Sequence, residues 1–275
     1  MYLWQAMRDV YKQLGQLRID TATSGSATTA GFTQLINSKE TDDAGKGGIC
    51  MVLYDAGGAG ASPEGKFGLI TSYVDSTGLY TFTPTMTDLI AAGDRIGIAG
   101  PRYPYQLVID EINRALQTIG PFESVPDISI TTAEGQTEYT LPAAITQINK
   151  IEISTGSDTN DYQWQDIDTT WTIQRTATVM LLVFDGQPTA GQLLKIWYKG
   201  THPAVGAYSD VITPYVHPEL LVLQASTYLL NYQVSRTAAQ DKAILQQFND
   251  AKGELDRARL EHRVPSSKKT QFLKV

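Results

Sequence analysis

The spacing of apolar residues predicts helices near both ends of the chain and one between them. Over residues 2–15, apolar side chains recur every three or four positions, which places them on one helix face. Residues 102–119 follow the same pattern and end at Gly120, a residue that often terminates helices. Residues 218–234 are strongly apolar and begin with Pro218, which suits the first turn of a helix.

The last predicted helix, over residues 237–263, carries an apolar seam. Thr237 and Gln240 are interpreted as a capping box at its start. Its apolar residues recur every 3.5 positions on average, the spacing of a helix that packs nearly antiparallel to, or coils around, another helix. With the helix before it, it forms a predicted αα-hairpin. The residues expected in this bundle or oligomer seam are Ile244, Phe248, Ala251 and Leu255.

Two stretches between the helices read as runs of short β-strands. The first, over residues 17–100, is rich in Gly, Thr, Ser and Ala, and its turn Asp75-Ser76-Thr77-Gly78 predicts a hairpin within a small antiparallel sheet or barrel. The second contains about six strand-like runs between turn clusters. Strands are predicted at 17–21, 49–54, 68–74, 79–83 and 95–99, and at 128–131, 138–141, 148–154, 170–175, 179–184 and 193–198.

These elements predict an α+β fold, in which helices distant in sequence form one bundle and two antiparallel β modules are inserted between them. The expected parts are a helical bundle from 1–16, 101–120 and 213–264, β modules over 17–100 and 121–212, and an extended C-terminal docking tail over 265–275.

Charge separates the tail from the rest of the chain. The 275 residues carry a formal net charge of −7, which argues against a general phosphate-binding surface. The tail holds three lysines and no acid, so the remainder carries −7 − 3 = −10. We expect the free tail to be disordered and to order on a partner, with its apolar pair in a groove and its lysines against acidic groups. The candidate partner-binding residues are Lys268, Lys269, Phe272, Leu273 and Lys274.

Patterns typical of catalysis or metal binding are scarce. Residues 60–66 match the start of a phosphate-binding loop, but Phe67 stands where Ser or Thr would hold magnesium. His202, His217 and His262 are too far apart in sequence to predict a zinc-type pair. The only cysteine, Cys50, cannot form an internal disulfide and lies in an apolar run, which favours a buried, inert thiol. We therefore predict a structural or assembly role, with no enzyme activity, metal or cofactor, and no membrane span.

Two parts of the sequence resemble virion proteins of tailed bacteriophages. One is a hairpin followed by Ala-Gly-Asp and by a helix with the pattern Ile-Asn-x-Ala-Leu, best covered over 65–120. Its residues are Ile70-Thr71-Ser72, Thr77-Gly78, Thr81-Phe82, Pro84, Ala92-Gly93-Asp94 and Ile112-Asn113-Arg114-Ala115-Leu116. The other, over 213–275, contains HPELLVLQASTYLL and FNDAKGELDRAR and is similar to the helical hairpin of head-tail connector (adaptor) proteins. Residues 125–200 match no such signature.

The resemblance implies a virion protein, assembled in the host cytoplasm, at the neck or head-tail junction. Such adaptors form a ring of identical subunits, commonly twelve, which docks beneath the portal protein and joins it to a neck or tail protein. Double-stranded DNA passes through the ring without sequence-specific contact. An acidic body suits that channel, because carboxylates facing it would repel phosphates.

Two other interpretations stay open at this point. One is a different neck, tail-tube or baseplate component of the virion. The less favoured one is a glycan-binding or carbohydrate-active protein, since Trp164 and Trp171 lie near an acidic cluster over 158–168. That cluster is interpreted as a solvated loop in preference to a weak calcium site, because its spacing is not that of a calcium-binding loop.

Overall fold

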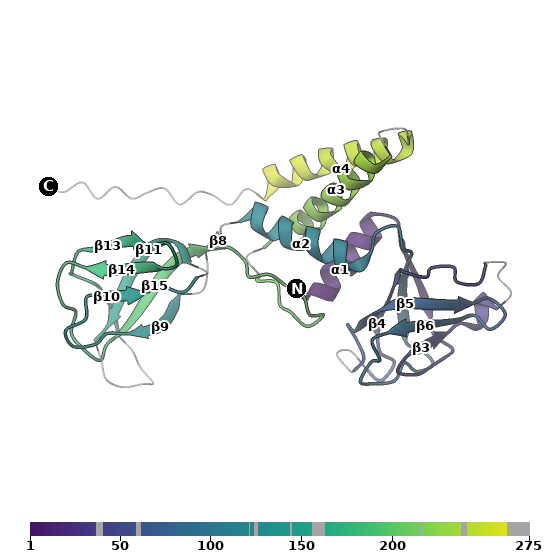
Figure 1. Ribbon diagram of the computed structural model, residues 1–275, viewed down its shortest axis with the longest axis horizontal. Helices are drawn as coiled ribbons and strands as arrows, with labels where there is room; N and C mark the ends of the chain where they lie inside the picture. The colour runs from purple at the N-terminus through teal and green to yellow at the C-terminus, as the bar shows by residue number, and fades with distance from the viewer. Residues whose placement is uncertain are drawn as a thin grey trace. The chain divides into compact units, whose positions relative to one another are not determined.

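The chain forms two compact units (Figure 1). The computed structural model describes residues 1–36, 41–58, 62–120, 122–123, 126–143, 145–155, 163–214, 216–237 and 241–262. The first unit comprises Met1–Ala115, Val205–Ile212 and His217–Val275, and the second comprises Leu116–Ala204 and Thr213–Val216. The chain therefore leaves the first unit after Ala115 and returns to it at Val205.

The predicted fold class is wrong, because the protein is β-rich. Within the described residues, the strands form antiparallel sheets of seven, three and five strands, and four α-helices accompany them. Each β region encloses a hydrophobic core of its own. Helical periodicity is the stronger signal in a sequence, so the prediction placed the main core between the helices. The structure instead places separate cores within the two β regions.

The first unit contains the seven-stranded sheet, ordered β1-β7-β4-β5-β6-β3-β2. Its strands are β1 (Leu17–Thr21), β2 (Ser24–Gly25), β3 (Thr29–Gly31), β4 (Ile49–Tyr54), β5 (Phe67–Val74), β6 (Leu79–Thr83) and β7 (Arg95–Ala99), with a 3-10 helix η1 at Thr33–Leu35. The predicted bounds of β1, β4, β6 and β7 are confirmed, and β5 begins one residue earlier than expected. The core of this sheet is rich in aromatic rings, among which Tyr73 and Tyr80 lie 4.4 Å apart between centroids.

The predicted hairpin at Asp75–Gly78 is confirmed. Val74 of β5 pairs with Leu79 of β6, and Gly78 adopts a positive φ of 61°. A side chain at Gly78 would also collide with the carbonyl oxygen of Phe32, while the amide of Phe32 donates to the Gly78 carbonyl at 3.0 Å. Glycine is therefore required both by the turn and by the close approach of the chain.

The second unit contains the other two sheets. The three-stranded sheet has the order β10-β14-β13, and the five-stranded sheet has the order β12-β11-β15-β8, with β9 also paired to β15. The bounds are β8 (Phe122–Glu123), β9 (Asp127–Thr131), β10 (Glu138–Thr140), β11 (Ile145–Ser154), β12 (Trp164–Asp166), β13 (Trp171–Arg175), β14 (Met180–Phe184) and β15 (Leu193–Gly200). One core joins both sheets through Leu182 and Phe184 on one side and Ile151, Leu194 and Ile196 on the other.

The helices are α1 (Leu3–Gln13), α2 (Tyr105–Ile119), α3 (Pro218–Arg236) and α4 (Lys242–Glu261). Apolar and small residues are buried around most of α3, because α1 and α4 both pack against it. The predicted hairpin of α3 and α4 is confirmed, and the two helices run side by side (Figure 1).

The predicted capping box at the start of the last helix is wrong. Thr237 is the C-terminal cap of α3, and Gln240 lies outside the described residues. The N-cap of α4 is Asp241, whose carboxylate accepts hydrogen bonds from the amides of Ala243 at 3.0 Å and Ile244 at 3.2 Å. A carboxylate at the N-cap also faces the positive end of the helix dipole, so Asp241 is well suited to this position.

Candidate functional site

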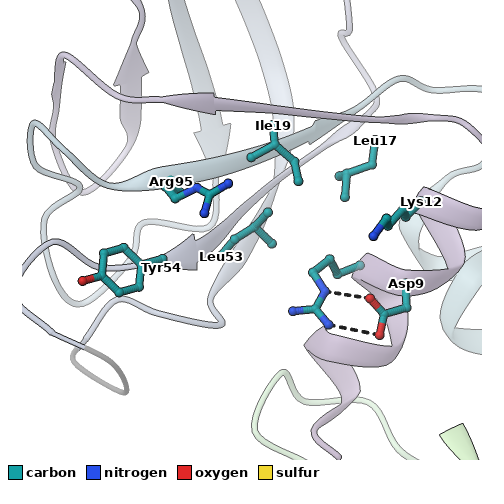
Figure 2. A pocket seen from close by; sticks show the side chains of 8 residues that line it. Asp9, Lys12, Leu17, Ile19, Leu53, Tyr54 and Arg95 are labelled. Atoms are coloured by element: carbon teal, nitrogen blue, oxygen red, sulfur yellow. Dashed lines mark hydrogen bonds and ion pairs between the residues drawn. The ribbon is translucent and has the colours of Figure 1, made fainter.

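A groove separates α1 from the first sheet and is here named the α1 groove (Figure 2). It has a volume of about 380 Å³. Its lining residues come from α1 and from three strands that are neighbours in the sheet. They are Arg8, Asp9 and Lys12 of α1, Leu17 and Ile19 of β1, Leu53 and Tyr54 of β4, and Arg95 of β7.

The alternation of side chains along the strands explains which residues reach this groove. On β7, Ile96 and Ile98 belong to the sheet's core, so Arg95 and Gly97 belong to the opposite face. A Cβ at Gly97 would lie 3.0 Å from the side chains of Leu17 and Met51. The missing side chain at Gly97 therefore allows an apolar layer to close over the sheet on the side of α1.

An irregularity in β4 places two consecutive residues in the groove. The register between β4 and β7 shifts between Val52 and Tyr54, and Tyr54 pairs with Arg95. Val52 lies in the core, whereas both Leu53 and Tyr54 line the groove. Bulges of this kind redirect side chains at sheet edges and functional sites.

The α1 groove is positively charged and partly apolar. Among the described residues that line it, Asp9 has the only carboxylate, and both of its oxygens accept hydrogen bonds from Arg8, at 2.8 and 3.0 Å. Lys12 and Arg95 add two further cations, while Ile19 and Tyr54 remain 43% and 41% exposed. A partner that carries apolar and acidic side chains would complement this combination of groups.

A second groove lies between α3 and α4 and has the opposite charge. This α3–α4 groove is lined by Gln13, Glu219, Val222, Leu223, Glu254, Arg257, Ala258 and Glu261. The lining therefore combines three carboxylates, one guanidinium and three apolar side chains. A shallow depression that includes Asp9, Lys12 and Gln13 adjoins both grooves along α1. The first unit thus presents a cationic and an acidic groove, and residues of α1 line both.

The predicted seam on the last helix is largely buried. Ile244, Ala251 and Leu255 are at most 5% exposed, and Phe248 is half-buried. Because α4 packs against α3, this burial arises within one chain. A seam between subunits at these residues stays a prediction. The predicted partner-binding residues Lys268, Lys269, Phe272, Leu273 and Lys274 lie outside the described residues.

The histidines have partners that their spacing in sequence does not reveal. The ring of His217 stacks on that of His262, with centroids 3.5 Å apart, and Nε2 of His262 lies 3.0 Å from a carboxylate oxygen of Glu219. His202 is buried elsewhere, and its Nε2 accepts a hydrogen bond from the amide of Thr213 at 3.0 Å.

The residues considered for catalysis have structural partners. Cys50 is fully buried, and burial raises the pKa of its thiol to about 12, which makes it inert as expected. In the region that resembles a phosphate-binding loop, Lys66 forms an ion pair with Asp88 at 2.6 Å. That lysine is therefore already engaged by a carboxylate, and residues 59–61 lie outside the described residues.

The tryptophans near the acidic cluster also have protein partners. Trp171 packs against the core of the second unit, and the ammonium of Lys195 lies 5.0 Å from the ring centroid of Trp164. Asp166 pairs with Lys150 at 2.6 Å. Residues 156–162, which include most of the cluster, lie outside the described residues.

The sequence did not single out the residues of the two grooves. A signal was present in Arg8 and Lys12, which lie four positions apart on the polar side of the first helix. The strand residues gave none, because their common position depends on pairing between β1, β7 and β4. In the described part of the chain, no helix is both long and apolar enough to cross a bilayer.

Comparison with known proteins identifies the family. No curated protein matches the chain. The sequence model of the SU10 adaptor protein matches residues 84–268, about two thirds of the chain, and this confirms the expected adaptor relationship. The family is one of phage structural adaptors, which are typically non-enzymatic and associate with other virion proteins. The chain therefore belongs to the SU10 adaptor protein family and is a structural adaptor of the phage virion.

Proposed function

We propose that this adaptor forms a ring of identical subunits beneath the portal protein and joins the capsid to the neck or tail. The observation that carries the proposal is the family match, which spans α2, the second unit, α3 and α4. A closed ring needs heterologous contacts, in which one surface of a subunit binds a different surface of the next. The two grooves beside α1 differ in charge and supply two chemically distinct surfaces for such contacts.

The ring is proposed to contain twelve subunits and to line the channel through which DNA passes. The chain's net charge of −7 supports this role. An excess of carboxylates would repel the phosphates of passing DNA, so that the ring does not grip it. No sequence-specific contact with DNA is required.

The C-terminal tail is proposed to dock on the portal or on a neighbouring subunit. Its lysines and its apolar pair need a groove with an apolar floor and an acidic rim. The α3–α4 groove has this chemistry, since Val222, Leu223 and Ala258 lie among three glutamates. A neighbouring subunit therefore offers a complementary site for the tail.

Electron microscopy and native mass spectrometry of the untagged protein, alone and with purified portal protein, test the ring. We expect a closed ring that binds the portal. The double variant Lys12→Glu with Arg95→Glu should lose the ring, whereas Lys242→Glu with Lys252→Glu makes the same charge change outside both grooves and should keep it. The proposal would be overturned if the protein stayed monomeric and did not bind the portal. It would also be overturned if electron microscopy of whole particles located the protein at the baseplate.

Truncation after residue 264 tests the tail separately. The shortened protein should remain folded but fail to join its partner, and Lys268→Glu with Lys269→Glu should weaken the same step. If the truncated protein supports infectious particles at normal yield, the tail has no docking role.

A further inference from the structure

Three side chains with metal-binding atoms meet where α4 ends beside the start of α3. His217 is the N-cap of α3, Glu219 lies in its first turn, and His262 is the C-cap of α4. One ligand atom of each lies within 4.8 Å of the others. His217 and His262 are separated by 45 positions, so the folded hairpin of α3 and α4 creates this cluster.

The spacing of these atoms is close to that of a bound ion. Zinc binds histidine nitrogen at about 2.0–2.1 Å with tetrahedral geometry, which places neighbouring ligand atoms about 3.3 Å apart. The distance of 3.0 Å between His262 Nε2 and Glu219 Oε2 is already near this value. The rings of His217 and His262 are stacked, so the ring of His217 must rotate before a nitrogen of each ring can face one ion. His217 and Glu219 are exposed, so their side chains have room to rotate until all three atoms face one ion.

The chemistry of the cluster selects the class of ion. Two imidazoles and one carboxylate are ligands for zinc and similar transition metals, whereas calcium and magnesium prefer oxygen alone. Glu219 also lines the acidic α3–α4 groove with Glu254 and Glu261.

We propose that His217, Glu219 and His262 form a zinc-type metal site that fastens the end of α4 to the start of α3. Water or a group from a partner would complete the four-coordinate shell. The ion would close the segment between residues 217 and 262 into a loop and reduce fraying of the last helical turn. It would also fix His262, the last residue of the hairpin that the structure describes. This site does not depend on the proposed ring.

Metal titration of the untagged full-length protein tests the proposal. Zn²⁺ binding is measured by calorimetry, and Co²⁺ binding by the visible absorption of a tetrahedral nitrogen and oxygen site. We expect one ion per chain, a rise in Tm on addition of Zn²⁺, and its reversal by a chelator. Variants His262→Ala and Glu219→Gln should each weaken binding by roughly tenfold or more and abolish the rise in Tm.

Glu261→Gln is the matched control, because it removes the same charge as Glu219→Gln from the same groove without removing a proposed ligand. Its affinity should stay within about twofold of the wild type. Equal losses in Glu261→Gln and Glu219→Gln would indicate diffuse attraction and overturn the site. Wild-type affinity in His262→Ala would overturn it as well, because the ion would then bind elsewhere, for example at His202, which every variant retains. If His262→Ala is unfolded, His217→Ala serves in its place.

Discussion

Asn113 and Val205 exchange two hydrogen bonds across 92 positions of sequence. The side-chain amide of Asn113 donates to the carbonyl of Val205 at 2.8 Å, and the amide of Val205 donates to the side-chain oxygen of Asn113 at 2.8 Å. Asn113 belongs to the Ile-Asn-x-Ala-Leu pattern of α2, so this pair gives that pattern a structural reason. One side chain therefore satisfies both the amide and the carbonyl of Val205, the residue at which the chain returns to the first unit.

Replacing Asn113 should therefore destabilise the protein. Asn113→Ala leaves two backbone groups of Val205 without partners and should lower the free energy of unfolding by about 1–3 kcal/mol. Asn113→Asp has nearly the same shape but places a carboxylate oxygen against the Val205 carbonyl, so it should also be destabilising. Chemical denaturation measures both. Gln117→Ala, at an exposed position of the same helix, should change the value by less than about 0.5 kcal/mol; a similar loss there would contradict the assignment.

Asp94 should be equally sensitive. It is fully buried, and its carboxylate accepts hydrogen bonds from the amides of Ala56 at 2.9 Å and Ala91 at 2.8 Å. Asp94→Ala should cost about 1–3 kcal/mol of unfolding free energy, because two loops lose their common acceptor. The Tm of Asp94→Ala is compared with that of Glu134→Ala, a control substitution at an exposed loop position. Matching Tm values for the two variants would show that Asp94 does not hold the loops.

The seam of α4 should show a graded response. Leu255 is 3% exposed, so Leu255→Ala should cost about 2–5 kcal/mol. A cost of about 3–5 kcal/mol would apply to Phe248→Ala if that ring were fully buried; it is half-buried, so its loss in the isolated chain should be smaller. Unfolding of both variants tests the order. If Phe248→Ala also weakens assembly while leaving the monomer folded, the exposed part of its ring belongs to a contact between subunits.

Asp88 should contribute to stability in a defined range of pH. Its pKa is lowered from 3.8 to about 2, first by the hydrogen bond from Lys66 and then by those from Ser62 and Thr87. A lowered carboxyl pKa stabilises the fold above the unfolded value and loses this contribution as pH falls through the folded value. The difference in Tm between wild type and Asp88→Asn should therefore shrink as the pH falls from about 4 to about 2. A difference that is constant over this range would count against the shift.

Local patterns predicted five of the seven strands of the first sheet, for physical reasons visible at particular residues, whereas the short strands β2 and β3 were not predicted. The hairpin needs a positive φ at Gly78, and only a few residue types provide it readily. β7 carries Ile96 and Ile98 two positions apart, and this period of two places both side chains in the core of the sheet. The prediction of the N-cap of α4 was wrong, because Thr237 and Asp241 are both suitable N-cap residues and the helix begins after the later one.

Long-range relationships explain what the sequence did not reveal. The fold class depends on whether sheets or helices enclose the cores, and short apolar runs do not show which partners cover them. The α1 groove requires Arg95 to lie beside Tyr54, which follows only from the register of β7 and β4. The meeting of His217 with His262 likewise depends on the lengths of α3 and α4 together. None of these pairings is encoded in a spacing that can be read along the chain.

The hydrogen bonds between Asn113 and Val205 have a consequence for how the protein can change over time. The chain departs from the first unit just after Asn113 and comes back at Val205, so the points of exit and re-entry are held next to each other. Most of the second unit is therefore an insertion whose ends are already close together, the arrangement in which domain exchange is best tolerated. Evolution, or an engineer, could replace residues between these points with another domain of neighbouring termini. Adaptors could in this way acquire new accessory surfaces while the unit that carries both grooves is preserved.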